Sequence, residues 1–256
     1  MKWDAEKYDG TKAPQIDAGK ELIDAARVRE TDSVIDIGCG TGKLTVRLAR
    51  LAHKGSVTGI DSSPEMLEKA RGISAGLSNL SFRQVEAQSL DFIDTFDLAF
   101  SNSAMQWVKA QGQALNRIYL ALKPGGRIAF QMPPKNFCKE FLDYTAETVE
   151  QPEFEKYFRN WELPWYFTLQ QEYEAMLMDT GFKKVDVSCR EYRYVFSSIS
   201  EVIDWWVSAG LRPFLAELPE GEQEGFKHSF AVKFERNMSG NGIEFAFRRL
   251  FTFAEK

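Results

Sequence analysis

A glycine-rich turn, Gly38-Cys39-Gly40-Thr41-Gly42, separates the apolar run Ser33–Ile37 from a helical pattern that begins at Lys43. Glycines allow positive φ and let a ligand approach the main chain closely. The start of the following helix presents unpaired N–H groups. Asp36 lies two residues before the first glycine, so a carboxylate is expected to point at the same cavity. That arrangement favours a cationic ligand over a pyrophosphate.

Two phosphate-binding motifs are excluded by single residues near this turn. The dinucleotide fingerprint requires Gly or Ala at position 43, which is Lys43. The P-loop requires Gly where Ile37 stands and Ser or Thr where Leu44 stands. The remaining alternative to a ligand-binding turn is a purely structural one.

Asp61 ends the second apolar run, 19 residues beyond Gly42, which is the spacing of a β–α–β unit. A carboxylate at this position can accept two hydrogen bonds from a ribose diol. Alone, such an aspartate more often caps the next helix. Ser62 and Met66 are candidates to pad an adenine ring, although Met66 is equally suited to the core.

Polar residues also follow the third and fourth predicted strands. Ala87 and Gln88 follow the third strand and could reach the edge of an adenine, or form a solvated loop. Ser101 and Asn102 end the fourth strand at the expected cavity, and Gln106-Trp107 follow shortly after. Each of these segments comes directly after a strand, where open α/β sheets bind their ligands.

Strand and helix patterns alternate through the first half of the chain, which predicts a doubly wound, mostly parallel α/β sheet of Rossmann-like type. Strands are expected at 33–37, 56–60, 80–85, 96–101, 127–132, 183–196 and 243–253. Helices are expected at 17–27, 43–53, from 63 onward, 111–122, 170–180, 200–209 and 221–237. We expect one domain with a core of 17–132, 183–196 and 243–256. The segments 133–182 and 197–242, which are rich in aromatic residues, are expected to form a helical cap over the ligand edge of the sheet.

Composition limits the possible functions. The chain has 256 residues and a net charge of −5, which argues against nonspecific binding of nucleic acid or anionic lipid. Three cysteines and two histidines without metal-ligand spacing make a metal site unexpected. The polar beginning of the sequence and the lack of a long apolar run predict a cytoplasmic protein without membrane contact.

The ordered set Asp36–Gly42, Asp61, Asp97–Asn102 and Leu122–Gly126 resembles the class I S-adenosylmethionine-dependent methyltransferases over roughly residues 30–132. The resemblance implies S-adenosylmethionine as cofactor and a seven-stranded sheet whose last strand is antiparallel. It implies that the glycine turn holds the methionine part, Asp61 the ribose, and Ala87-Gln88 the adenine. The cofactor-binding residues expected on these grounds are Asp36, Gly38, Cys39, Gly40, Gly42, Asp61, Ser62, Met66, Ala87, Gln88, Ser101 and Asn102.

Shorter patches across the chain resemble the trans-aconitate 2-methyltransferases. These patches are Trp3-Asp4 with Tyr8, Ser101–Trp107, Gln131–Pro133, Gly210–Phe214 and Arg248–Phe251. The Asn102 to Trp107 segment is also similar to malonyl-carrier-protein methyltransferases. The resemblance therefore implies methyl transfer to a small, anionic acceptor, most simply a carboxylate oxygen of a trans-aconitate-like acid, by a monomer or homodimer.

A carboxylate acceptor is already ionised at neutral pH and needs no general base, so alignment and desolvation are expected to drive the reaction. The acid would be bound by cations, hydroxyls and polar groups. We expect Tyr8, Gln106, Trp107, Arg212 and Arg248 in this role, and only one of the adjacent Arg248 and Arg249 can face the cavity. The alternatives are an N- or C-methyltransferase and a non-catalytic protein that binds S-adenosylmethionine. Nucleic-acid methylation is disfavoured by the charge and by Ser101–Ala104 after strand four.

Overall fold

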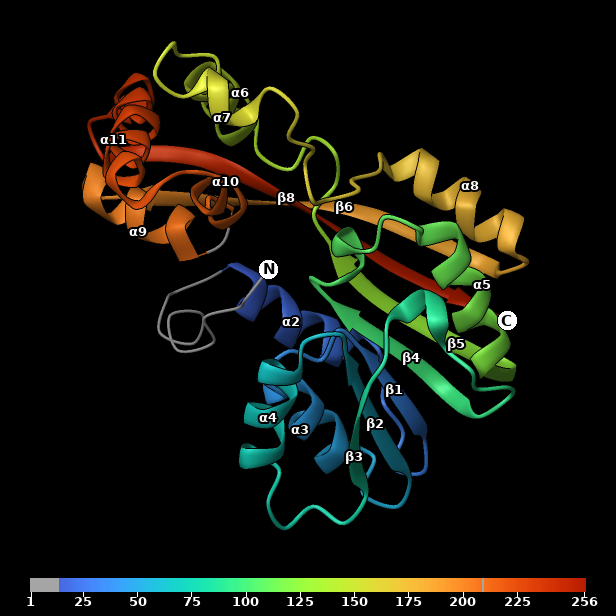
Figure 1. Ribbon diagram of the computed structural model, residues 1–256. Helices are drawn as coiled ribbons and strands as arrows, with labels where there is room; N and C mark the ends of the chain where they lie inside the picture. Colours follow the sequence, from blue (N-terminus) through green and yellow to red (C-terminus); the bar gives the residue numbers. More distant parts are fainter. Residues whose placement is uncertain (1–13, 209) are drawn as a thin grey trace.

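The computed structural model describes residues 14–208 and 210–256 and is built around one twisted sheet (Figure 1). The strand order is β3-β2-β1-β4-β5-β8-β6, and a two-residue strand, β7, pairs with β8 to make eight. The strands are β1 (Ser33–Ile37), β2 (Ser56–Asp61), β3 (Leu80–Gln84), β4 (Phe96–Asn102), β5 (Leu122–Met132), β6 (Lys183–Phe196), β7 (Met238–Ser239) and β8 (Gly242–Glu255). Strands β1 to β5 pair in parallel, and β8 runs antiparallel to both of its long neighbours. The predicted mostly parallel α/β sheet is confirmed, with β7 as the one added strand.

The helices of the described residues cover both faces of this sheet and one end of it. They are α2 (Pro14–Ala25), α3 (Lys43–Leu51), α4 (Pro64–Ile73), α5 (Gln111–Ala121), α6 (Lys139–Val149), α7 (Glu155–Phe158), α8 (Gln170–Thr180), α9 (Ile199–Ser208), α10 (Arg212–Glu217) and α11 (Glu220–Ala231). Three short 3₁₀ helices, η1 (Ala87–Ser89), η2 (Met105–Trp107) and η3 (Val232–Asn237), complete them. The helices α6, α7 and α10 were not expected from the sequence.

Successive strand residues belong to different cores because side chains alternate across a sheet. Val34 of β1 packs with α2 and α3 on one face, whereas its neighbour Ile35 packs with α5 and α8 on the other. Ile128 and Ala129 of β5 divide in the same way. Burial on both faces explains why the central strands are continuous apolar runs rather than alternating ones.

Strand β5 starts earlier than the sequence suggested. The segment Pro124–Gly126, just before the expected strand, lies inside β5 as an irregularity, since β4 pairs Phe96 with Leu122 and then Leu98 with Arg127. Gly125 takes a φ of +75°, which the bend requires and glycine supplies.

Strands β6 and β8 continue past the end of β5 as a two-stranded ribbon. Pairing between β5 and β8 stops at Met132 with Leu250, while β6 and β8 stay paired as far as Phe196 with Ile243. Figure 1 shows α6, α7, α9, α10 and α11 gathered around this far end of the ribbon. Aromatic side chains from these helices and from Phe245 and Phe247 of β8 form a separate apolar core.

Helix α8 packs against β6 and α5, with Tyr173 and Leu177 buried in the core of the sheet. By these contacts it belongs with the sheet rather than with the cap. We therefore propose a division of the chain in which the core includes α8, and the cap comprises the remainder of 133–182 together with 197–242. In the described part of the chain, no helix has the length and apolar character needed to span a membrane.

Replacing Phe245 with alanine should lower the free energy of unfolding by about 3–5 kcal/mol, because a large buried ring leaves a cavity when it is removed. The ring is 2% exposed and stacks on Phe196 with centroids 5.0 Å apart. Urea denaturation of Phe245→Ala measures the loss. Val195→Ala on the same ribbon, where the side chain is 55% exposed, serves as the control and should change little. Equal effects of the two substitutions would contradict a packed core around the ribbon.

Candidate active site

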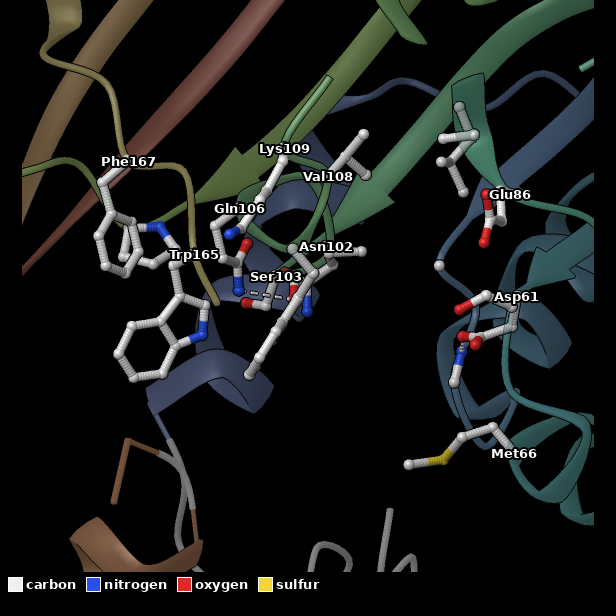
Figure 2. A pocket seen from close by; sticks show the side chains of 18 of the residues that line it. Asp61, Met66, Glu86, Asn102, Ser103, Gln106, Val108, Lys109, Trp165 and Phe167 are labelled. Atoms are coloured by element: carbon white, nitrogen blue, oxygen red, sulfur yellow. Dashed lines mark hydrogen bonds between the residues drawn. The ribbon is translucent and has the colours of Figure 1, made fainter. Parts of the chain in front are cut away.

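A cavity of about 520 Å³ lies at the carboxyl ends of β1, β2 and β4, between the sheet and the cap. Its size is that of a small-molecule or cofactor site. Figure 2 shows two separated groups of side chains around it. Asp61, Met66 and Glu86 stand on one side, and Trp165 and Phe167 on the other, with Asn102, Ser103 and Gln106 between them.

The glycine turn after β1 is bonded to the end of β2. The backbone N–H groups of Gly38 and Cys39 both donate to the carbonyl of Ile60, at 2.8 and 2.9 Å. Gly38, Gly40 and Gly42 take φ values of +70°, +54° and +81°, which only glycine adopts readily. A Cβ added to Gly38 would lie 2.1 Å from the Cβ of Ala104, whereas one added to Gly40 would meet nothing within 4 Å. The turn thus leaves an open space beside Gly40, which lines the cavity.

Asp61 joins this turn to the start of α4. Its Oδ2 accepts a hydrogen bond from the Gly40 N–H and its Oδ1 accepts one from the Ser63 N–H, each at 2.9 Å. Burial raises the pKa of this carboxyl, and the backbone N–H groups around it act in the opposite direction. Both oxygens still have a lone pair for a ligand hydroxyl, and Asp61 lines the cavity.

Asp36 does not line the cavity, contrary to the sequence expectation. It is 2% exposed and accepts a 2.6 Å hydrogen bond from the Thr45 hydroxyl of α3. Burial raises its pKa to about 7; the Thr45 hydrogen bond lowers it, and the charge of Asp61 raises it further. The side chain connects β1 to α3 beneath the glycine turn instead of facing the ligand space.

Three further residues expected to bind cofactor also lie away from the cavity lining. Ser101 is buried and donates to the Ile37 carbonyl at 2.9 Å, which joins β4 to β1. Gly42 begins α3 so close to α4 that an added Cβ would lie 2.9 Å from the Ala70 Cβ. Cys39 is buried, and burial together with the charges of Asp36 and Asp61 raises the pKa of its thiol. The structure places these three residues outside the cavity lining, where they hold the turn in position.

The remaining expected cofactor residues are brought together around the Asp61 end of the cavity. They are Gly38, Gly40, Asp61, Ser62, Met66, Ala87, Gln88 and Asn102. Glu86 also lines the cavity and accepts a 2.7 Å hydrogen bond from the Gln88 amide. It stands in the same segment after β3 that the sequence analysis had singled out. The result is a slot with apolar walls at Met66 and Ala87 and carboxylates at one edge, which fits a ligand with a sugar diol and a positive charge.

Ser103, which sequence analysis did not assign to the site, organises the middle of the cavity. It takes a φ of +56°, a conformation that non-glycine residues rarely adopt and that is frequent at functional sites. Its hydroxyl donates to Gln131 Oε1 at 2.9 Å and accepts from the Arg249 guanidinium at 3.1 Å. Its carbonyl accepts from the Gln106 amide at 2.8 Å. The serine thereby fixes both Arg249 and Gln106.

Arg249, not Arg248, faces the cavity. Arg249 is 3% exposed, lines the cavity, and lies over the Phe247 ring at 4.6 Å. Arg248 points to the opposite side of β8, where its Nε donates to Glu191 at 3.2 Å. The choice of Arg248 was therefore wrong, because adjacent residues of a strand face opposite ways.

The other residues expected to bind the acceptor lie in different places relative to the cavity. Gln106 and Trp107 both line the cavity. Arg212 does not; its Nε donates to the Val207 carbonyl at 3.3 Å, near the start of α10. That prediction is corrected. Tyr8 lies outside the described residues.

The segment that follows β4 is bonded directly to the cap. The Tyr166 N–H donates to the Gln106 carbonyl at 2.8 Å, and the Gln111 amide donates to the carbonyls of Met105 and Tyr166 at 2.9 and 3.0 Å. These bonds place Trp165 beside Trp107, with ring centroids 5.5 Å apart. No group of His, Cys, Asp and Glu among residues 14–208 and 210–256 is placed to hold a metal ion.

Comparison with known proteins agrees with this geometry. Residues 29–181, more than half of the chain, match the methyltransferase domain family. The chain belongs to this family, and it is an S-adenosylmethionine-dependent methyltransferase, as the sequence motifs predicted.

Two relatives align over essentially their whole length. A trans-aconitate 2-methyltransferase of Deinococcus radiodurans is 29% identical, over 100% of this chain and 99% of the relative. A trans-aconitate 2-methyltransferase of Escherichia coli is 28% identical, over 99% of this chain and 98% of the relative.

Solved structures share the fold. The YcgJ protein from Bacillus subtilis is 18% identical with a TM-score of 0.63, covering 94% of this chain and 98% of that one. Phosphoethanolamine N-methyltransferase 2 of Haemonchus contortus, in complex with S-adenosyl-L-methionine, is 19% identical with a TM-score of 0.62. The match covers 98% of this chain and 56% of that one.

The two glycines of the turn that line the cavity should respond differently to alanine. Gly38→Ala adds a methyl group 2.1 Å from Ala104 and should lower the free energy of unfolding by more than about 2 kcal/mol. Gly40→Ala meets no protein atom and should lower it by only about 1–2 kcal/mol, through its left-handed φ. We expect Gly40→Ala nevertheless to weaken S-adenosylhomocysteine binding, measured by calorimetry on the folded variant. Unchanged affinity would remove the space beside Gly40 from the cofactor site.

Asp36→Asn should change how stability depends on pH. Because the pKa of Asp36 is raised from 3.8 to about 7, the folded protein holds a proton that the unfolded chain has lost between these values. Its contribution to stability is complete below pH 4 and disappears as pH rises through about 7. The free energy of unfolding of the variant should therefore rise relative to that of the parent by up to roughly 4 kcal/mol between pH 4 and pH 8. Urea titrations at both ends of this range measure the difference, and a constant difference would contradict a raised pKa.

Proposed function

We propose that this protein transfers a methyl group to a carboxylate oxygen of a small organic acid. The observation behind the proposal is the position of Arg249, a buried guanidinium that lines the cavity, donates to Ser103 and lies over the Phe247 ring. Arginine's planar fork matches a carboxylate with two parallel hydrogen bonds. The cavity thus has carboxylates where a cationic methyl donor would bind and a cation where an acid would bind.

The donor would be held by the residues at the Asp61 end. Asp61 would accept hydrogen bonds from its ribose, Glu86 and Gln88 would face its adenine, and Met66 and Ala87 would pack on the ring. The open space beside Gly40 would take its amino-acid part. When bound, S-adenosylmethionine supplies an electrophilic methyl group on a positively charged sulfur.

The acceptor end suits a nucleophile that is already ionised. The described lining residues include no histidine, which is the neutral side chain that takes a proton most readily near pH 7. A carboxylate, with a pKa of about 4, needs no base at neutral pH. Arg249 and Ser103 would orient it, and the aromatic walls would exclude water, which strengthens both contacts.

The full-length relatives support an acid substrate, since both are named trans-aconitate 2-methyltransferase. Trans-aconitate is therefore the first acid to test. The direct assay supplies methyl-labelled S-adenosylmethionine with a panel of carboxylic acids, amines and carrier-protein thioesters. Esters that form only from acids would support the proposal, and methylation of amines alone would overturn it.

Arg249→Met should raise KM for any acid that the enzyme methylates by about 10- to 100-fold, the expected loss for hydrogen bonds to a charged group. Arg248→Met is the matched control, because Arg248 is the adjacent residue, faces Glu191 and does not line the cavity. It should leave KM unchanged. S-adenosylhomocysteine affinity should be the same in both variants, which confirms that each is folded. An unchanged KM in Arg249→Met would contradict the role of this arginine.

A further inference from the structure

Aromatic rings line the cavity together with Arg249. The rings that line the cavity on the cap side are Phe137, Trp165, Phe167, Trp205, Trp206 and Phe247. They contact one another in sequence: Trp165 lies 5.4 Å from Phe167, and Phe167 lies 5.0 Å from Phe137. Phe137 in turn lies 5.2 Å from Phe247, on which the Arg249 guanidinium rests. The described residues thus form one continuous aromatic chamber that opens beside a single buried cation.

Trp165 and Phe167 face this chamber because of how their segment is bonded. The N–H of Tyr166 donates to Gln106, and the carbonyl of Thr168 accepts from the Lys135 N–H at 2.8 Å. Between these bonds the chain is extended enough that Trp165 and Phe167 turn inward, while Tyr166 is 43% exposed. Both inward rings are only half-buried, and the surface left uncovered looks into the cavity (Figure 2). Such a surface is available to a ligand.

Few charged side chains of the described residues line the cavity near the aromatic chamber. Apart from Arg249, the only cation among the described lining residues is Lys109, whose side chain is 57% exposed and pairs with Glu162 at 3.0 Å. Among the described residues, a second carboxylate of a bound acid would lose its water against aromatic rings and find no second buried cation in the lining. Desolvation of an unpaired charge is strongly unfavourable. Burial of an apolar group at the same place is favourable.

We infer that the acceptor is an amphipathic acid, with one carboxylate on Arg249 and Ser103 and an apolar, aliphatic or unsaturated body in the aromatic chamber. This inference rests on the proposed function and narrows it. It sets the expected substrate apart from a compact tricarboxylate such as trans-aconitate. The chemistry remains transfer of a methyl cation equivalent from sulfur to a carboxylate oxygen, which gives a neutral ester and S-adenosylhomocysteine.

The test is a homologous series of straight-chain acids from butanoate to decanoate, compared with trans-aconitate and citrate. If the body binds in the chamber, kcat/KM should rise by roughly two- to fourfold for each added methylene until the chamber is filled. The tricarboxylates should be poorer substrates than the best of the monocarboxylates. A flat or falling series, with trans-aconitate preferred, would overturn the inference while leaving carboxylate methylation intact. Failure of every acid would instead overturn the proposed function itself.

Trp165→Ser provides an independent measurement on the same series. Removing the ring should reduce the gain per methylene, so KM should rise more for the longest acids than for the shortest, because the shortest acid has the least apolar body to contact the ring. Leu163→Ser is the matched control: it lies in the same segment, is 47% exposed and does not line the cavity. It should keep the parent's dependence on chain length. An identical dependence in Trp165→Ser and the parent would place the body of the acid elsewhere and contradict the inference.

Discussion

The site depends on the carboxylate of Asp61, which bonds the turn after β1 to the start of α4. One oxygen holds the Gly40 N–H of the turn after β1, and the other holds the Ser63 N–H at the start of α4. These bonds fix the positive φ values of the turn and the position of the first residues beyond β2. A partly buried carboxylate satisfied by backbone donors is also oriented for a ligand. The same residue therefore builds the slot and faces into it.

The charged groups that line the cavity are divided between its two sides. Asp61 and Glu86 lie on one side of the cavity, and Arg249 lies over Phe247, which contacts the aromatic rings of the other side through Phe137. Ser103 connects Arg249 to β5 through Gln131. Opposite charges at the two ends would hold a cationic donor and an anionic acceptor in line, where attraction between the reacting groups also helps to align them. Little further catalytic machinery is required, which agrees with a described lining that contains no histidine or cysteine.

The sequence predicted the sheet well because glycine turns and apolar runs report on backbone geometry directly. It predicted the acceptor end less well. Arg249 could have been identified, since it has the same parity on β8 as Phe245, Phe247 and Phe251, and alternation along a strand puts the four on one face. The roles of Asp36 and Ser101 could not be predicted, because their partners Thr45 and Ile37 become neighbours only after the chain folds. Helices α6, α7 and α10 lacked a clear sequence pattern, since the cap packs on itself and on the end of the ribbon through aromatic contacts.

The ribbon of β6 and β8 has a consequence for how such proteins diverge. The slot around Asp61 is formed by residues up to Asn102, whereas the chamber walls come from β8 and from segments next to β6, the two strands that extend past the end of β5. Substitutions in the chamber leave the pairing of β1 to β5 untouched. Acceptor preference can therefore drift over evolutionary time while donor recognition is retained, and two proteins of equal overall similarity can differ in the compound that they modify.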